Sequence, residues 1–418
     1  MQKELRLFGA PCGTMPGSRY ASGSRPPSAV ARDRWPPSLF TTIVRILIDY
    51  RPALRHRTGV GLWMARLVEA LARQDSATRP DLTIFSSSWK DRLTTAVPAG
   101  VRAVDRRIPV RCLNWLWHRH QWPPVEALTR GAFDVVHSPT PLLIPTRGAA
   151  QVVTIHDLDF LEHPERSVRE VRRDYGRLAR AHARQADVVV VPSQYTADRV
   201  RSTFNLSSER VVVCPNGSPG WPRRPAAITP KHLLFVGTVS ARKNVVRLLE
   251  AYARVRRAHP DAPPLVLAGH VSPGDAAVLA RLELAPLAGH VRHEGYVDDE
   301  RLRTLYEQAV GLILPSLDEG FGIPALEAME MGVPVLAARR GALPEVLGDA
   351  GLLVDPLDVD ALAGGIGRVI TDTALRRRLE QAGPIQARRF SWDSSAARLR
   401  EAYEVAREYR LARMPRTQ

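Results

Sequence analysis

The chain has 418 residues, of which 44% are hydrophobic and 24% are charged, and this composition excludes a wholly disordered or fibrous protein. A net charge of +16 raises the question of nucleic-acid binding. Only four of the 59 basic residues are lysines, however, and the arginines are spread along the chain instead of clustering on one predicted element. Charge of this kind argues for solubility and nonspecific attraction, so we expect no nucleic-acid partner.

The cellular compartment is inferred from three features of the sequence. No run approaches the roughly 18 consecutive apolar residues of a membrane-spanning helix, and the first residues lack the apolar stretch of a secretory signal. The three cysteines lie about a hundred residues apart, a spacing that predicts neither a disulfide framework nor a metal site. We therefore expect a cytoplasmic protein with reduced thiols.

The first half of the chain is predicted to be a tail followed by one domain. Residues 1–42 are rich in proline, glycine, serine and arginine and are expected to be a disordered tail. Residues 43–220 alternate short apolar runs with amphipathic stretches, which predicts an N-terminal Rossmann-like domain. Its predicted strands are 44–50, 81–87, 133–138, 151–157, 187–193 and 210–217. Helices are expected over 62–73, 166–186 and after a cap at Ser193.

The second half repeats the alternation after a proline-rich linker at 221–231. Residues 232–390 are predicted to be a second Rossmann-like domain, and 391–418 a C-terminal helix and tail that begins its helix near Asp393. The predicted strands include 232–237, 264–269, 291–295 and 310–315, and the predicted helices include 245–258, 275–287, 299–309, 358–372 and 374–388. The predicted fold class is α/β, with two Rossmann-like domains facing each other across a cleft, where ligands of such sheets bind.

The loop TGVG (58–61) joins the first strand to the first long helix. Gly59 and Gly61 allow close approach of the backbone to an anion at the helix N-terminus. A dinucleotide fingerprint would need a third glycine where Met64 stands, so NAD binding is not expected, and no P-loop sequence occurs. The alternative to anion binding is a purely structural role, in which the loop is a tight turn that needs a positive φ at one glycine.

The loop after strand 232–237 carries a basic pair, Arg242 and Lys243, immediately before a helix that Asn244 is expected to cap. A guanidinium fork and a compact ammonium group suit a diphosphate. The alternative, a solvated basic pair, is disfavoured because cations at a helix start oppose its dipole.

The segment EGFGIPALE holds two glutamates, Glu319 and Glu327, after strand 310–315. Eight helical residues would span about 12 Å, so the carboxylates are expected to hold different ends of an extended ligand instead of one metal ion. The apolar neighbours of Glu327 disfavour the alternative of a solvent-exposed helix face. Pro324 suits the first turn of the helix. Glu319 and Lys243 are expected in a cleft loop and not in a core, so that alanine leaves the fold intact.

These motifs, with GTVSARKN upstream and GVPVLAARRGALPEVLGDAGLLVDPLD downstream, resemble the retaining nucleotide-sugar glycosyltransferases of family 4, which have the GT-B fold. The resemblance covers most of 44–410 and is strongest over 232–360. It implies roles for individual residues: Arg242 and Lys243 hold the donor diphosphate, Glu319 with the backbone of Phe321 and Gly322 contacts the sugar, Glu327 binds the ribose, His156 and Asp157 face the reacting sugar, and Gly59, Gly61, Gly237 and Ile323 belong to the donor site.

The implied activity is transfer of a sugar from a nucleoside diphosphate to a hydroxyl of a glycan or lipid-linked acceptor, with GDP-mannose favoured by resemblance. No cofactor is expected. No metal site is expected either. The one D-x-D match is residues 157–159, and the adjoining His156 gives this segment a role other than metal binding. Two alternatives stay open: an epimerase or phosphorylase on the same fold, and a noncatalytic basic protein that binds membranes or polyanions.

The segment 111–124 holds three tryptophans, Trp115, Trp117 and Trp122, among arginines and histidines. Indoles with nearby cations suit a membrane interface, so this segment is a candidate for peripheral contact at the inner face of the membrane. The alternative is ordinary packing of the tryptophans in the core.

Overall fold

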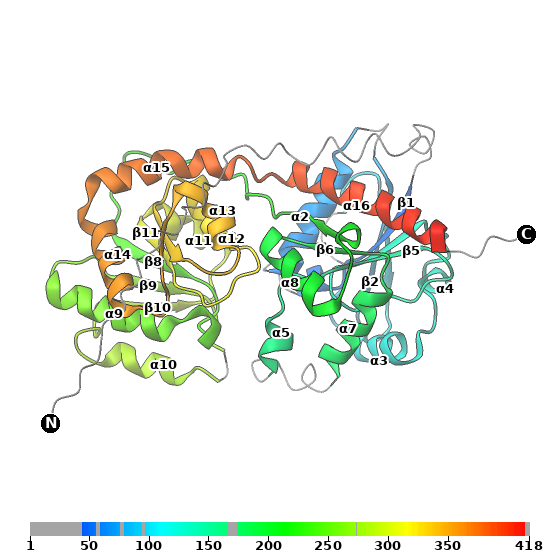
Figure 1. The fold of residues 1–418 in the computed structure, drawn as a ribbon, viewed down its shortest axis with the longest axis horizontal. Coiled ribbons are helices and arrows are strands. Elements are labelled where there is room, and N and C mark those ends of the chain that lie inside the picture. The colour runs from blue at the N-terminus through cyan, green and yellow to red at the C-terminus, as the bar shows by residue number, and fades with distance from the viewer. Residues whose placement is uncertain are drawn as a thin grey trace, which may run out of the picture. The chain divides into compact units, whose positions relative to one another are not determined.

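The computed structural model describes residues 44–55, 59–75, 79–93, 97–164, 174–272 and 274–413, which lie in one compact unit, Ile43–Gln418 (Figure 1). The disordered tail expected over 1–42 falls outside these residues. Two separate all-parallel sheets, each accompanied by helices, confirm the predicted α/β class with two Rossmann-like domains.

The first sheet has the strand order β3-β2-β1-β4-β5-β6-β7. Its strands are β1 (Arg45–Asp49), β2 (Asp81–Ser87), β3 (Val101–Arg106), β4 (Val135–Ser138), β5 (Ala150–Thr154), β6 (Val188–Val191) and β7 (Val211–Val213). The associated helices are α1 (Pro52–Arg55), α2 (Val60–Ala72), α3 (Val110–Trp115) with a π-helical turn (Leu116–His120), α4 (Val125–Thr129), α5 (Asp159–Glu162), α7 (Tyr175–Gln185), α8 (Gln194–Phe204) and a 3₁₀ turn (Ser208–Arg210). Ile46 lies in register with Leu82 on one side and Val135 on the other.

The second sheet has the order β10-β9-β8-β11-β12-β13. Its strands are β8 (His232–Val236), β9 (Leu265–Ala268), β10 (Val291–Gly295), β11 (Ala309–Leu314), β12 (Val335–Ala338) and β13 (Leu352–Val354). Its helices are α9 (Val245–Ala258), α10 (Ala277–Ala280), α11 (Asp299–Glu307), α12 (Ile323–Glu330), α13 (Leu343–Leu347), α14 (Val359–Thr371) and α15 (Thr373–Ala387), with 3₁₀ turns at Ala241–Lys243, Arg281–Glu283 and Gly348–Ala350.

The central strands of both sheets are buried because their side chains are apolar on both faces. β6 and β9 are runs of Val, Leu and Ala that are buried along their whole length. Strand β3 was not predicted. Its sequence VRAVDR leaves Arg102 and Ala103 exposed at the edge of the sheet, so it carries no apolar run.

The last helix, α16 (Trp392–Arg413), packs against the first sheet, beside β5, β6 and α2 (Figure 1). Leu399 and Tyr403 belong to the apolar cluster that includes β1 and α2. The Tyr403 hydroxyl lies 2.8 Å from Nδ1 of His137, whose Nε2 lies 2.8 Å from the hydroxyl of Thr154. Burial lowers the pKa of His137 to about 3, so this ring is neutral at pH 7.

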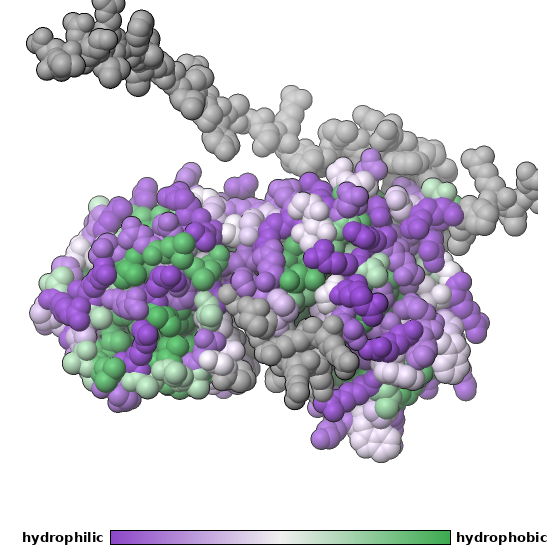
Figure 2. Space-filling view, turned by 60° about the horizontal axis from the view of Figure 1, so that its bottom comes forward, coloured by the Kyte–Doolittle hydropathy of each residue, from purple (hydrophilic) through white to green (hydrophobic). Residues whose placement is uncertain are grey.

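Hydrophilic residues cover much of the face drawn in Figure 2, and hydrophobic residues form smaller patches among them. Within the described residues, no helix has both the length and the apolar character needed to cross a bilayer.

Candidate functional site

Two loops of the second domain meet where the strand order of its sheet reverses. Strands β8 and β11 are neighbours in the sheet, although β9, β10 and three helices separate them in the chain. The loop after β8 carries Arg242 and Lys243, and the loop after β11 carries Glu319. Open α/β sheets bind ligands at this position. The topology therefore brings the two predicted motifs together.

Lys243 and Glu319 form a buried ion pair. Nζ of Lys243 contacts Oε1 of Glu319, and the two side chains keep only 10% and 8% of their surface exposed. The hydroxyl of Ser316 donates to the same carboxylate oxygen at 2.7 Å. Burial alone would raise the pKa of Glu319, but the charges of Lys243 and Arg242 outweigh it and hold this pKa below its usual value. Glu319 is therefore ionised at neutral pH.

This burial corrects one expectation about the pair. Lys243 and Glu319 do border a cavity, yet they are also packed inside the protein, so alanine at either position removes the nearest opposite charge from a buried group. Breaking a buried pair in this way is strongly destabilising. We therefore expect either alanine substitution to destabilise the fold.

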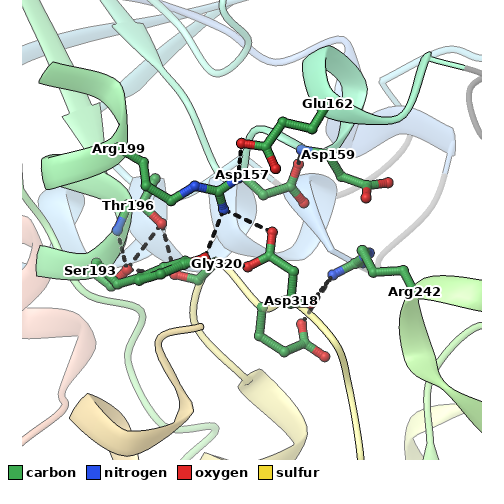
Figure 3. A network of polar contacts seen from close by, with 11 residues as sticks. Asp157, Asp159, Glu162, Ser193, Thr196, Arg199, Arg242, Asp318 and Gly320 are labelled. Atoms are coloured by element: carbon green, nitrogen blue, oxygen red, sulfur yellow. Dashed lines mark hydrogen bonds and ion pairs between the residues drawn. The ribbon is translucent and has the colours of Figure 1, made fainter. Parts of the chain in front are cut away.

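Arg242 connects the same two loops through the backbone. Its Nη1 donates to the carbonyl oxygen of Asp318 at 2.8 Å (Figure 3) and approaches Oε2 of Glu319 at 3.4 Å. The amide of Leu317 donates to the carbonyl of Arg242 at 2.8 Å. The position of the guanidinium is thus set by the loop that carries Glu319.

Asn244 is the N-cap residue of α9, as predicted, but its side chain makes no capping hydrogen bond to the helix. Its backbone is left-handed, with φ of 58°, and its Nδ2 donates to the carbonyls of Pro315 at 3.1 Å and Pro356 at 2.7 Å. The two carbonyls lie in loops after β11 and β13, so the amide holds the basic loop against them.

Glu327 lies on α12 with 7% of its surface exposed, which rules out the solvent-exposed alternative. The Tyr306 hydroxyl donates to its Oε2 at 2.8 Å. Burial raises the pKa of Glu327 to about 7, and the nearby carboxylates of Asp299 and Glu330 add to the shift. Pro324 lies in the first turn of α12, as predicted.

The two glutamates are not separated by eight helical residues, because Glu319 lies in the loop before α12. The spacing of about 12 Å predicted for a continuous helix therefore does not apply. The carboxylates nevertheless have different partners: Lys243 for Glu319 and Tyr306 for Glu327. Gly322 makes the turn between them possible, since its φ of 106° suits glycine.

His156 and Asp157 follow β5 of the first domain and approach the loop with Glu319. A Cβ added to Gly320 would lie 2.0 Å from the carbonyl oxygen of His156. The His156 ring packs edge-on against Trp63, with centroids 4.9 Å apart, and burial lowers its pKa to about 4. Among the described residues its Nε2 has no hydrogen-bond partner. Burial also raises the pKa of Asp157.

Of the two glycines predicted to act in the loop before α2, only Gly59 lies in the turn. Gly59 precedes α2 with φ of 57°, which confirms a turn with positive φ. Gly61 is buried inside α2. Thr58 of the same motif lies outside the described residues.

A cavity of about 450 Å³ is lined by residues of both domains. This volume falls in the range of small-molecule sites, roughly 300–1,000 Å³. The lining includes every predicted site residue except Gly61: Gly59, His156, Asp157, Gly237, Arg242, Lys243, Glu319, Phe321, Gly322, Ile323 and Glu327.

Several residues around the cavity were not predicted. Tyr306 fits the apolar spacing of α11, so its hydrogen bond to Glu327 left no signal in the sequence. His270 and Tyr296 follow β9 and β10 and stack with ring centroids 5.2 Å apart. An aromatic residue directly after a strand is the signal that could have indicated them. In the part of the chain that the structure describes, no group of three or more His, Cys, Asp or Glu residues could hold a metal ion.

The tryptophan-rich segment divides into buried and exposed parts. Trp117 is fully buried; its Nε1 donates to the carbonyl of Pro123 at 3.0 Å and its ring lies under the guanidinium of Arg51. Trp115 and Trp122 are 55% and 62% exposed. The packing alternative is therefore correct for Trp117, and the other two indoles remain candidates for an external contact.

Two protein-family models match the chain. The model described as Glycosyltransferase Family 4 matches residues 57–219, and the model described as Glycosyl transferases group 1 matches residues 223–386. The two matches follow the division into the two domains.

Similar proteins agree with these matches. The O-antigen chain mannosyltransferase B of Escherichia coli is 32% identical over 283 residues, which are 65% of this chain and 74% of the relative. The MMP alpha-(1->4)-mannosyltransferase of Mycolicibacterium hassiacum is 33% identical over 308 residues, 68% of this chain and 73% of the relative. The structure of sucrose-phosphate synthase from Thermosynechococcus elongatus superposes with a TM-score of 0.68 at 21% identity and covers 86% of this chain and 98% of that chain.

Proposed function

Since the chain belongs to glycosyltransferase family 4 and has the GT-B fold, we propose that it is a retaining, metal-independent mannosyltransferase. In this proposal, mannose moves from GDP-mannose to a hydroxyl of a glycan or lipid-linked acceptor. The observation that carries the proposal is the cavity in which Lys243, Arg242 and Glu319 meet at the carboxyl ends of β8 and β11.

Arg242 and Lys243 are proposed to hold the donor diphosphate. As the bond from the sugar to the β-phosphate breaks, negative charge grows on the phosphate oxygen, and fixed cations stabilise that charge. An ammonium group has three N–H donors, so the contact of Lys243 with Glu319 does not exhaust its capacity. Both cations are held by the loop after β11, so little reorganisation is needed when charge develops. Their charge is the reason to propose a reaction without a divalent metal ion.

Glu319 is proposed to accept hydrogen bonds from hydroxyls of the transferred sugar, since its carboxylate is ionised and borders the cavity. The backbone of Phe321 and Gly322 completes this part of the site. Glu327, further along the same segment, is proposed to bind the nucleotide ribose. Gly237 and Ile323 are proposed to border the bound donor.

His156 and Asp157 are proposed to face the reacting sugar from the first domain. The unpartnered Nε2 of His156 suits a hydrogen bond to a sugar hydroxyl, and the neutral ring provides this without a charge. Gly59 allows the backbone at the start of α2 to approach the donor phosphates.

The names of the similar proteins support mannose as the sugar, because two of them are mannosyltransferases. Trp115 and Trp122 support a lipid-linked acceptor and contact with the inner face of the membrane, since both indoles are exposed on the domain opposite the donor loops. The proposed location is therefore the cytoplasm, at the membrane surface.

The test is incubation of the purified protein with a panel of nucleotide sugars and a pool of lipid-linked acceptors. Of the nucleotide sugars, GDP-mannose should raise the melting temperature most. It should release GDP only when acceptor is present, and EDTA treatment should leave the rate of GDP release unchanged. Nuclear magnetic resonance of the product should show the anomeric configuration of the donor. Turnover with another donor, an inverted product or loss of activity with EDTA would each overturn the corresponding part of the proposal.

A further inference from the structure

Helix α8 of the first domain contacts the loop of the second domain that carries Glu319. The contact involves the residues on either side of that glutamate, Asp318 and Gly320 (Figure 3). We call the set of Ser193, Tyr195, Thr196 and Arg199 with these two residues the α8 contact. None of these α8 residues borders the cavity.

Two buried hydroxyl groups point at the carbonyl oxygen of Gly320. Ser193 donates to it at 2.7 Å and Thr196 at 3.2 Å, and neither side chain is more than 2% exposed. Ser193 also accepts from the amide of Thr196 at 3.1 Å, which confirms its predicted role as the cap of α8. One serine thus begins the helix and fixes a peptide of the other domain.

The carboxylate of Asp318 is held by one residue of the first turn of α8 and one of the second. The Tyr195 hydroxyl donates to one oxygen at 2.9 Å, and Nη1 of Arg199 donates to the other at 2.8 Å. Nη2 of Arg199 pairs with Glu162 of α5, so the guanidinium is itself fixed from a second side. Arg199 and Asp318 are 21% and 18% exposed, which leaves little room for solvent screening.

The second domain also completes the start of α8. The carboxylate of Glu345 on α13 accepts from the amides of Gln194 at 2.8 Å and Tyr195 at 3.1 Å. These amides have no partner within the helix, and an anion at this end is favoured by the helix dipole. Helix α8 is therefore joined to the second domain both through its side chains and through its N-terminal amides.

We propose that Ser193, Thr196 and Arg199 are positioning residues that orient Glu319 for sugar transfer by holding the carbonyl of Gly320 on one side of it and the carboxylate of Asp318 on the other. The proposal rests on the role of Glu319 given above. These contacts restrain the segment that carries Glu319 and so limit the directions that its carboxylate can take. A glutamate without these contacts still pairs with Lys243, but it samples orientations that do not match the sugar.

The first test compares Thr196→Val, which removes one hydroxyl donor at constant shape, with Thr196→Ser, which keeps it. Loss of a neutral hydrogen bond commonly changes a rate constant by a factor of about five. Thr196→Val should therefore lower kcat about fivefold and leave the donor KM unchanged. Thr196→Ser should restore kcat. The rates are measured with the nucleotide sugar that supports turnover by the unmodified protein, so failure of the donor proposal is recognised separately.

A second test does not depend on turnover. Calorimetry gives the dissociation constants of the nucleoside diphosphate and of the nucleotide sugar for each variant. Thr196→Val should leave the first constant unchanged and reduce the additional affinity that the sugar provides, since Glu319 contacts only the sugar. If Thr196 had a purely structural role, Thr196→Val would weaken the binding of both ligands equally and lower the melting temperature.

The ion pair provides a stronger perturbation with a matched control. Arg199→Met removes a charged hydrogen bond to Asp318, so kcat should fall by about 10- to 100-fold. Arg201→Met removes an arginine of the same helix that pairs with Asp198 at the surface, and it should retain the full rate. Equal kcat values for Thr196→Val, Arg199→Met and the unmodified protein would overturn the proposal, and so would an equal loss with Thr196→Ser.

Discussion

The ammonium group of Lys243 and the carboxylate of Glu319 meet across 76 positions of sequence, at the carboxyl ends of two neighbouring strands. The pair lies at the border between the protein interior and the cavity. It therefore has two functions that substitution affects together: it joins the loops after β8 and β11, and it places opposite charges beside the proposed donor.

We predict that Lys243→Ala and Glu319→Ala each reduce both activity and stability. Loss of a charge partner in the transition state commonly lowers the rate by about 100- to 1,000-fold. The remaining buried charge should lower the free energy of unfolding by roughly 3 kcal/mol. Steady-state kinetics and urea denaturation measure the two effects.

The double variant Lys243→Met/Glu319→Gln is the control for stability. It removes both charges, so it should be more stable than either single alanine variant while remaining inactive. If its loss of stability equalled the sum of the losses in Lys243→Met and Glu319→Gln, the two charges would not interact.

We predict that Glu327→Gln makes the protein more stable above pH 7. The pKa of Glu327 is raised from 4.5 to about 7, so between these values the folded protein holds a proton that the unfolded chain has lost. Stability contributed by this group therefore falls as pH rises from about 4.5 to 7, by about 3 kcal/mol in total. Denaturant titrations at pH 5, 6, 7 and 8 should show the stabilities of the two proteins diverging in favour of the variant. Parallel curves would contradict the prediction.

The same titration should appear in donor binding. If Glu327 accepts hydrogen bonds from the ribose, its ionised form binds better, and the donor KM should fall about tenfold as pH rises through about 7. Glu327→Gln should have a higher KM without this step and a nearly unchanged kcat. Initial rates across pH 6 to 8.5 give both quantities. A pH step retained in the variant would assign it to another group.

We predict that Trp115→Ser/Trp122→Ser weakens binding to vesicles of anionic phospholipid about tenfold and leaves the melting temperature unchanged. Both side chains are more than half exposed. Trp117→Ser is the contrasting variant, because this indole is fully buried and its loss should destabilise the first domain. Vesicle sedimentation and thermal denaturation separate the two effects. Undiminished binding by the double variant would place the membrane contact elsewhere.

We predict that Gly320→Ala is far more damaging than its size suggests. The new Cβ would lie 2.0 Å from the backbone oxygen of His156, and backbone cannot move aside cheaply. The expected loss is about 1–3 kcal/mol of stability and most of the activity. Gly364→Ala is the matched control, since an added Cβ there meets no atom within 4 Å, and alanine in helix α14 should stabilise by about 0.5–1 kcal/mol. Similar behaviour of the two variants would exclude the close approach.

The elements that the sequence predicts best are those with uninterrupted apolar patterns. β2 and α9 begin and end at the predicted residues, because their burial follows from their apolar patterns. β10 also has its predicted bounds, although Val291 is its only buried residue. β3 could not be recognised in this way, since it lies at a sheet edge and contains Arg102, Asp105 and Arg106. The helix predicted near 275–287 is also shorter, with α10 giving way to a 3₁₀ turn.

The residues that border the cavity were predicted in both domains, but the contact of α8 with the loop that carries Glu319 was not. Lys243 and Glu319 follow parallel strands, so the sheet alone brings them close. The contact of Ser193 with Gly320 has no such signal, because a helix cap has the same sequence whether or not a second domain lies against it. The side-chain contacts of Asn244 were missed for the same reason, since its amide donates to carbonyls of distant loops.

Helix α16 has a consequence for how the protein is made. Its residues Ala396, Leu399 and Tyr403 complete the apolar cluster of the first domain, yet the ribosome adds them after the whole second domain. During synthesis, the face of the first sheet that α16 covers stays open to solvent until translation is almost finished. Chaperones should therefore need to shield this apolar face for most of the synthesis. Chains that stop before Trp392 keep the face exposed and should be degraded, even though they contain both sheets.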